Sequence, residues 1–471
     1  MTFHFDNSWL RDLPGTFLRQ NPETAPAPKL VILNRQLADD LGLDSEELVQ
    51  NGAAWFSGAA LPPGADPAAL AYAGHQFGYF SEVLGDGRAL LLGEFTDRQG
   101  RRWDLQLKGS GRTPFARFGD GKAVLGPMLR EYLVSEAMAA LNVPTTRSLA
   151  VATTGEIVPR DGRPEPSAVL ARIAASHIRI GSFQYFAARR ELDKLRALAD
   201  YTMARHDPDL AAGDYLGFFD RVITRQARLI AQWMGLGFIH GVMNTDNMAI
   251  SGETIDYGPC AFMERFAPGT VFSSIDRQGR YSWANQPLIL GWNLAKFAET
   301  LVPLIDLAPE LAVEALNHLL SGIKDRYRAE WLGIMRVKLG LTEQEAGDDA
   351  LIEDLLAAMT GADWTLTFYQ LATAIKDTDQ LKALFDDFSE MAAWLKRWRG
   401  RNPDPEIMRR ANPAVVPRNL MVNEALEAAR MGDMQPFHSL LAAVQRPFVE
   451  QADYMQPAPA DAPPFVTYCG T

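Results

Sequence analysis

Cysteine is nearly absent from this sequence, which has only Cys260 and Cys469 in 471 residues. Two cysteines are too few for a framework of disulfides or for a zinc site built on thiolates. Such a sequence is typical of a protein from a reducing compartment, where both would be free thiols. The alternative is a single bridge between them, which would hold the C-terminal tail near residue 260.

Long apolar runs are also missing, since none approaches the roughly 20 residues that a membrane-spanning helix needs. The first residues, MTFHFDNSWLRDLPGTF, lack the basic and apolar regions of a signal peptide. Basic residues are in deficit, with 46 Lys and Arg against 58 Asp and Glu and a net charge of -12. Because nucleic acid requires a basic face, we expect a cytoplasmic protein with no nucleic-acid partner and no membrane partner. The oligomeric state is open, with a monomer favoured.

The first part of the chain alternates short β-type runs with glycine turns. One helical segment interrupts them, GPMLREYLVSEAMAAL, in which Pro127 suits the first helical turn. The β-type runs are ALLLGEF, WDLQLKG, SLAVATTG and AVLARIA. This pattern predicts a small β-rich unit with one important helix.

From about residue 185 the apolar residues recur at helical spacing. The predicted helices are FFDRVITRQARLIAQWMGLGF, LGWNLAKFAETLVPLI, ELAVEALNHLLSGIKDRY and MVNEALEAARM. The sequence therefore predicts an α+β, bilobal, protein-kinase-like fold with its active site in the cleft. The expected division is an N-terminal extension 1–60, an N-lobe 61–175, a C-lobe 176–330, a helical extension 331–450 and a Pro-rich tail 451–471.

The stretch FIHGVMNTDNMAISGETIDYG resembles the catalytic and metal loops of protein kinases. His240 and Asn247 keep the spacing of H-R-D-x-x-x-x-N, but Val242 stands where the kinase base would be. Asp256 follows the strand-like AIS…TI and precedes Tyr-Gly, as the metal-binding Asp does in D-F-G. Carboxylate and amide oxygens suit Mg²⁺, so Asn247 and Asp256 are predicted metal ligands. Asp246, one residue before Asn247, is the carboxylate left to accept a proton.

Lys108 ends a strand in which polar and apolar residues alternate, so it shares a face with Asp104 and Gln106. A lysine there would neutralise nucleotide phosphate, and in kinases a glutamate on the next helix holds it. Periodicity does not choose between Glu131 and Glu136, because each could lie beside an apolar helical face.

Arg172 and Arg179 flank the expected junction in ARIAASHIRIG. Arginines in a cleft hold phosphates by forked hydrogen bonds, and two would suit a leaving pyrophosphate. His75 and His240 have no further His or Cys nearby in sequence, so we expect hydrogen-bonded structural histidines.

The assembled pattern resembles the selenoprotein O family, pseudokinase-like protein adenylyltransferases, over nearly the whole chain. The shared segments are FDNSWLRDLPG, YAGHQFG, LGDGRALLLGE, LQLKGSGRTPFARFGDGKAVLGPMLREYLVSEAM, HGVMNTDNM, DYGPCAFM and NPAVVPRN. The resemblance implies that ATP binds in a flipped orientation and that AMP passes to Ser, Thr or Tyr hydroxyls of proteins while pyrophosphate leaves. It also implies Mg²⁺ or Mn²⁺ as the metal.

Carried over to this sequence, the resemblance selects Glu131 as the partner of Lys108. It implies that Arg172 and Arg179 contact the phosphates of the flipped ATP and that Asp246 acts as the base. Further nucleotide contacts are predicted within the shared segments, at Gly85, Gly87, Arg88, Asp120 and Gly121. Cys469 stands near the C-terminus, where eukaryotic members carry selenocysteine, so a regulatory Cys260–Cys469 disulfide becomes a specific hypothesis.

Three other functions are also compatible with the sequence. The first is a protein uridylyltransferase that prefers UTP. The second is an inert nucleotide-binding pseudokinase scaffold, motivated by the missing base at Val242. The third is a small-molecule kinase that transfers the γ-phosphate.

Overall fold

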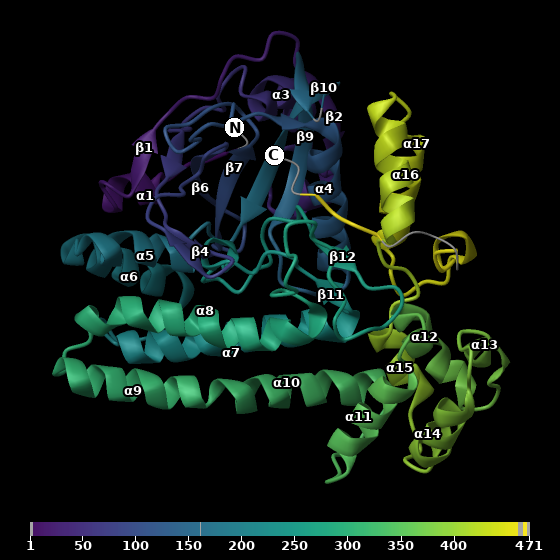
Figure 1. Ribbon diagram of the computed structural model, residues 1–471. Helices are drawn as coiled ribbons and strands as arrows, with labels where there is room; N and C mark the ends of the chain where they lie inside the picture. Colours follow the sequence, from purple (N-terminus) through teal and green to yellow (C-terminus); the bar gives the residue numbers. More distant parts are fainter. Residues whose placement is uncertain (1–2, 161, 460–464, 469–471) are drawn as a thin grey trace.

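The computed structural model describes residues 3–160, 162–459 and 465–468. It is an α+β protein, as predicted. An antiparallel sheet with flanking helices lies on one side of the molecule, and a layer of long helices runs across below it (Figure 1).

The described strands of the main sheet pair in the order β1-β3-β6-β7-β10-β9-β2, with β8 added beside β10. Every pairing between these strands is antiparallel. Their bounds are β1 Phe17–Arg19, β2 Lys29–Leu33, β3 Ala68–Leu70, β6 Ala89–Thr96, β7 Arg102–Lys108, β8 Ala123–Val124, β9 Arg147–Arg160 and β10 Arg163–Ala174. The N-terminal segment thus supplies both edge strands, β1 and β2.

The predicted alternation in β7 is confirmed. Leu105 and Leu107 pack into one apolar cluster with the helix α3 (Ser45–Ser57). Asp104 and Gln106 point to the other face, but they are fully buried there and not solvated. Burial is tolerated because both are hydrogen-bonded: Asp104 accepts from Arg205 at 2.5 Å, and Gln106 accepts from Arg172 at 2.5 Å.

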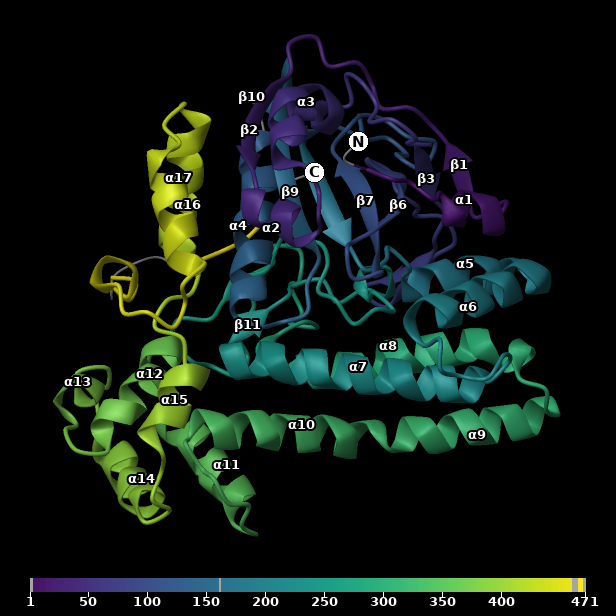
Figure 2. The same cartoon turned by 180° about the vertical axis from the view of Figure 1, so that it is seen from behind.

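Helices cover both faces of the sheet. On one face α3 and the short α2 (Arg35–Asp40) pack on β9 and β10, while α4 (Leu125–Ala140) packs on the other face through residues such as Leu129. The pair α16 (Asn419–Arg430) and α17 (Gln435–Val444) lies outside α4 and shares its apolar cluster (Figures 1 and 2). The central helix α4 is therefore buried on both sides, which places Glu131 and Glu136 in the interior.

The lower layer consists of long amphipathic helices. The longest, α7 (Tyr215–Leu236), begins where the Asp214 side chain accepts from Gly217 N and ends at Gly237 in the left-handed conformation. The predicted single helix after residue 309 is wrong, since α9 (Pro309–Ser321) and α10 (Ile323–Lys338) are separate and meet at Gly322. The other members are α5 (Ile180–Arg189), α6 (Leu192–His206) and α8 (Gln286–Leu301).

A smaller helical group follows α10, with bounds α11 Asp348–Ala358, α12 Trp364–Ala374, α13 Asp379–Lys382, α14 Ser389–Arg399 and α15 Pro405–Ala411. The motif NPAVVPRN leads from this group to α16, and its Arg418 is almost fully buried. Arg418 forms an ion pair with Asp363 at 2.8 Å and lies 3.5 Å from Glu264, so it ties three segments together. In the described parts of the chain, no helix is long and apolar enough to cross a membrane.

The four β-type runs all lie in strands and the four helical segments lie in helices, with one of these segments divided at Gly322 into α9 and α10. The strand expected before Asp256 is wrong. Ala249 and Thr254 each form only an isolated bridge, to Arg179 and Thr145 respectively. A turn with Gly252 at φ +78° separates them, so neither half is long enough for a ladder.

Candidate active site

A cavity of about 800 Å³ lies between the sheet and the helical layer. Residues from β7, α4 and β10 line one side, and the segment 242–259 lines the other. All the residues that the sequence predicted for nucleotide and metal binding line it: Gly85, Gly87, Arg88, Lys108, Asp120, Gly121, Glu131, Arg172, Arg179, Asp246, Asn247 and Asp256.

The carboxylate of Asp256 is the centre of the cavity's charge network. One oxygen accepts from Lys108 Nζ at 2.6 Å and from Arg172 Nη1 at 2.8 Å. The other accepts from Arg179 Nη1 at 2.9 Å. The side chains of both arginines are 3% exposed, so little water screens these pairs.

This arrangement makes Asp256 an ionised group. Burial by itself would raise its pKa, but Lys108, Arg172 and Arg179 together hold the pKa well below its usual range. Asp256 also has a backbone φ of +66°, a conformation that an aspartate tolerates better than most residues. That φ turns the chain sharply just before Tyr257, which is buried.

The structure distinguishes the two glutamates that periodicity left open. Lys108 Nζ bonds to Glu131 Oε1 at 2.5 Å, so the predicted lysine–glutamate ion pair is present. Glu136 lies farther along α4, where it pairs with Arg147 at 2.6 Å and accepts from Asn34 at 2.8 Å. Glu136 thus joins α4 to β9 and to the loop before α2, away from the cavity.

Asp246 lies in the short 3-10 helix η1 (Thr245–Asn247). Its Oδ2 accepts from Gln76 Nε2 at 3.2 Å, and its Oδ1 is buried with no hydrogen-bond partner. Arg179 contacts its backbone carbonyl at 2.7 Å, not its carboxylate. Burial raises the pKa of Asp246 to about 6, only partly offset by Arg179. A carboxylate of this kind can accept a proton near neutral pH.

Asn247 and His240 shape the loop. Asn247 Nδ2 donates to the carbonyl of Val242 at 2.9 Å, so its amide is held beside the position that lacks the kinase base. His240 donates from Nε2 to Ile255 O at 2.9 Å and stacks on Trp233, with 5.2 Å between ring centroids. The predicted structural role of His240 is confirmed.

The donor atoms at this loop fit a hard divalent cation that also binds phosphate. In the described part of the chain, no cluster of three or more His, Cys, Asp or Glu side chains could hold a metal alone. Mg²⁺ usually takes only one or two carboxylates and completes its shell with water and substrate phosphates. Asp256, Asn247 and the unpartnered Oδ1 of Asp246 therefore offer suitable oxygens.

The predicted glycine-containing segments form the opposite wall. Gly85 has φ +64°, and a Cβ there would overlap the ring of Phe115. Gly121 has φ +72°, and a Cβ there would lie 2.2 Å from Gly111 O, so only glycine fits either position. Asp120 accepts from Lys122 N at 3.0 Å and pairs with Arg160 at 2.7 Å, which shows a role in shaping this loop.

Sequence reasoning missed several lining residues. The guanidinium of Arg179 lies 4.8 Å from the ring centroid of Tyr72, the first residue of the shared segment YAGHQFG. Arg130, one residue before Glu131, donates to the carbonyls of Gly258 and Cys260 and so holds the segment after Asp256. Both residues lie in segments shared with the family, but their spacing from the other site residues does not predict a place in the cavity.

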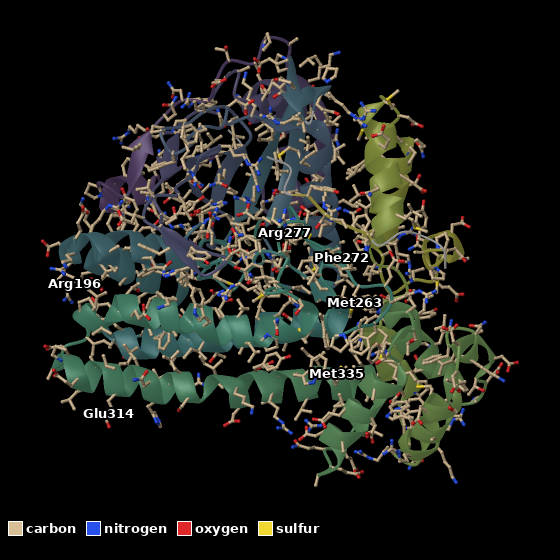
Figure 3. The ribbon with its side chains drawn as sticks, viewed as in Figure 1. Arg196, Met263, Phe272, Arg277, Glu314 and Met335 are labelled. Atoms are coloured by element: carbon tan, nitrogen blue, oxygen red, sulfur yellow. The ribbon has the colours of Figure 1, made fainter. Side chains whose placement is uncertain are left out.

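The C-terminal residues 465–468 also line the cavity. Thr467 Oγ1 donates to Pro259 O at 2.7 Å. The ring centroids of Phe465 and Phe272 are 6.1 Å apart. Figure 3 labels Phe272 between the sheet and the helices. Cys260 is fully buried, and burial raises its pKa to about 11. Cys469 lies outside the described residues, so the Cys260–Cys469 bridge stays a prediction.

Comparisons with known proteins identify the family of the chain. A family model described as protein adenylyltransferase SelO matches residues 2–445. A protein nucleotidyltransferase YdiU of Cereibacter sphaeroides (strain ATCC 17029 / ATH 2.4.9) is 57% identical over 481 residues, covering all of both chains. Proteins of the same name from Chromobacterium violaceum and Rhizobium johnstonii are 54% and 51% identical, covering 98% and 100% of this chain and 100% and 97% of theirs. The chain is therefore a nucleotidyltransferase that belongs to the family of protein adenylyltransferase SelO.

Proposed function

We propose that this protein transfers AMP from ATP to Ser, Thr or Tyr hydroxyls of other proteins and releases pyrophosphate. The observation that carries the proposal is the convergence of Lys108, Arg172 and Arg179 in one cavity, within a chain of net charge -12. A triphosphate is the ligand that needs such a local concentration of cations.

We also propose that the fold is a bilobal protein-kinase-like one. Two features support this proposal. The strands β3-β6-β7-β10-β9 form a five-stranded antiparallel sheet, and α4 packs against that sheet with its Glu131 paired to Lys108 of β7. On this reading residues 61–175 form the N-lobe and 176–330 the C-lobe. Residues 1–60, 331–450 and 451–471 are additions to that core, and those of 1–60 complete the sheet edges.

ATP is proposed to bind with its α-phosphate toward Asp246 and its terminal phosphates toward the buried arginines. Asn247 and Asp256 would hold Mg²⁺ or Mn²⁺, which neutralises phosphate charge when bound. Arg172 and Arg179 then stabilise the negative charge that develops on the leaving pyrophosphate. They lie behind Asp256, so they act in a dry environment where each charge interaction is strong.

The proposed step conserves atoms and charge. The acceptor hydroxyl oxygen attacks the α-phosphorus and forms the new P–O bond, while the bond between the α-phosphorus and the bridging oxygen to the β-phosphate breaks. The bridging oxygen leaves as part of pyrophosphate, and the hydroxyl proton passes to the carboxylate of Asp246. Val242 has no proton-accepting group, so the proposed base is Asp246, one residue before Asn247.

We propose that a Cys260–Cys469 disulfide regulates this site in a cytoplasmic enzyme. The hydrogen bond from Thr467 to Pro259 supports it, because it brings the tail up to residue 468 beside the buried thiol of Cys260. Mass spectrometry after thiol blocking of the oxidised protein tests the bridge. Finding both cysteines blocked and unpaired would exclude it.

The main experiment incubates the purified protein, Mg²⁺ and cell lysate with ATP labelled at either the α- or the γ-phosphate, and repeats the assay with α-labelled UTP and with Mn²⁺. Asp246→Asn is the control, because it removes the proposed base but keeps a side chain of the same shape. We expect denaturation-resistant label from α-labelled ATP only, lost in the variant. Label from γ-labelled ATP would indicate a kinase, label only from UTP a uridylyltransferase, and ATP binding without label a scaffold.

A further inference from the structure

We propose that the β-hairpin of residues 74–81 is a positioning element for the transfer reaction, and that Gln76 at its tip orients the carboxylate of Asp246. The hairpin consists of β4 (Gly74–Gln76) and β5 (Tyr79–Ser81) and contains the residues GHQFG of the shared segment YAGHQFG. It leaves the main sheet after β3 and returns to it before β6. The inference rests on the proposed function, because it assigns a role within that reaction.

Three consecutive residues of the hairpin bind three consecutive residues of the loop around η1. His75 N donates to Thr245 Oγ1 at 2.7 Å, and Phe77 N donates to Asn244 Oδ1 at 3.1 Å. Between them Gln76 Nε2 donates to Asp246 Oδ2 at 3.2 Å. The two outer bonds fix the register of the hairpin against the loop, and in this register the amide of Gln76 is presented to the Asp246 carboxylate.

The two outer anchors are themselves held in place. Thr245 Oγ1 donates to Gln184 Oε1 at 2.7 Å, and Gln184 Nε2 donates to His75 Nδ1 at 2.9 Å, which closes a ring of hydrogen bonds. Asn244 Oδ1 also accepts from Tyr281 OH at 2.6 Å. Networks in which every member is bonded are stiff, so the hairpin can define a geometry and not only fill space.

The turn of the hairpin supports the same conclusion. Phe77 and Gly78 both have positive φ, 52° and 90°, as a tight two-residue turn requires. Phenylalanine is unfavourable at such a position and is kept there by the contacts of its amide with Asn244 and Tyr281. Strain of this kind persists only where the surroundings specify the conformation.

Gly74 shows how closely the hairpin approaches Asp246. A Cβ at Gly74 would lie 2.7 Å from Asp246 Oδ1 and 2.9 Å from Leu84 Cδ1. Oδ1 is buried and has no hydrogen-bond partner, so it is held by this packing alone while Oδ2 is held by Gln76. The two contacts together fix both carboxylate oxygens. The hairpin is a separate two-stranded sheet, joined to the main sheet through the chain on either side of it, and its side-chain contacts tie it to the loop that carries Asp246.

The test measures transfer from α-labelled ATP in Gln76→Leu, with Gln99→Leu as the matched control. Gln99 is exposed in a turn and is not one of the residues that line the cavity. We expect Gln76→Leu to lower kcat about 10- to 100-fold, as loss of a hydrogen bond to a charged group does. KM for ATP and the dissociation constant of ATP should stay within about twofold, because Gln76 holds the base and not the phosphates. Gln99→Leu should match the wild type in every parameter.

Gly74→Ala is the second variant and should lower kcat by about 10-fold or more, since a misplacement of a catalytic group by about 1 Å costs about 100-fold and the added Cβ displaces the Asp246 carboxylate by part of that distance. Both variants should keep the thermal midpoint of the wild type to within a few degrees. A wild-type kcat in Gln76→Leu, or a rise in KM for ATP that accounts for the whole loss, would overturn the inference. Failure of the proposed function is a different result, in which the wild type itself transfers no α-label.

Discussion

Two isosteric changes at neighbouring carboxylates should have opposite effects on stability. Asp256→Asn removes the carboxylate that accepts from both Arg172 and Arg179 and leaves their guanidinium groups facing Lys108 without that counter-charge. Removing one partner of a buried ion pair costs about 3–5 kcal/mol. The Asp256 side chain is 20% exposed to the cavity, so we expect the lower end, about 3 kcal/mol of the free energy of unfolding.

Asp246→Asn is the matched control. No cation bonds to its carboxylate, and burial already disfavours its charge by raising its pKa to about 6. Replacing it by an amide removes a buried charge that has only a neutral donor, Gln76. We therefore expect the free energy of unfolding at pH 8 to stay within about 1 kcal/mol of the wild-type value or to rise.

The assay is equilibrium unfolding in urea at pH 8, followed by tryptophan fluorescence. The unfolding of the wild type and of Asp256→Asn is then repeated with pyrophosphate and without a metal ion. Pyrophosphate should stabilise Asp256→Asn more than the wild type, because the three cations are then free to bind the anion. Equal losses in the two variants, or no loss in Asp256→Asn, would refute the account of Asp256 as the centre of a buried cation cluster.

Three further outcomes follow from the same structure. Glu131→Gln should lower kcat/KM for α-labelled ATP about 10- to 100-fold, because Lys108 loses a charged partner; an unchanged value would show that the pair is dispensable. Glu253→Gln tests a half-buried carboxyl whose pKa burial raises to about 7 from 4.5. A raised pKa means that the group's contribution to stability is present below about pH 4.5 and is lost as pH rises through 7, so the variant should gain about 1–2 kcal/mol on the wild type between pH 5 and pH 8, measured by urea unfolding. Arg418→Met should lower the free energy of unfolding by about 3–5 kcal/mol, because Asp363 would be left buried without its partner; a loss below 1 kcal/mol in urea would contradict this.

Local sequence was sufficient for the elements that have a strong periodicity. The alternation in β7 and the helical spacing of α7 are each set by residues a few positions apart, so the pattern predicts them without knowledge of their neighbours. The prediction failed at Gly322, where one helix ends and the next begins in nearly the same direction (Figure 1), and before Asp256, where a turn interrupts the expected strand. Before Asp256 the outcome depends on which distant backbone groups, such as Thr145 and Arg179, offer a partner.

In the candidate site, too, the sequence predicts some residues and leaves others to be decided by the tertiary structure. Spacing alone singled out His240, Asn247 and Asp256, since a loop motif is contiguous in the chain. It could not choose Glu131 over Glu136, because both lie on a helix that is buried on two sides. That choice depends on which strand faces each glutamate, Lys108 on β7 or Arg147 on β9.

Sequence by itself determined the residue types, the order of the elements, the family and the set of charged groups available for a nucleotide. Only the tertiary structure decided that three cations meet on Asp256, that Gln76 reaches Asp246 over 170 positions of sequence, and that residues 465–468 join the cavity wall. The physical reason is that hydrogen bonds and ion pairs act over a few ångströms in space. Their partners here lie far apart along the chain, so no local pattern encodes them.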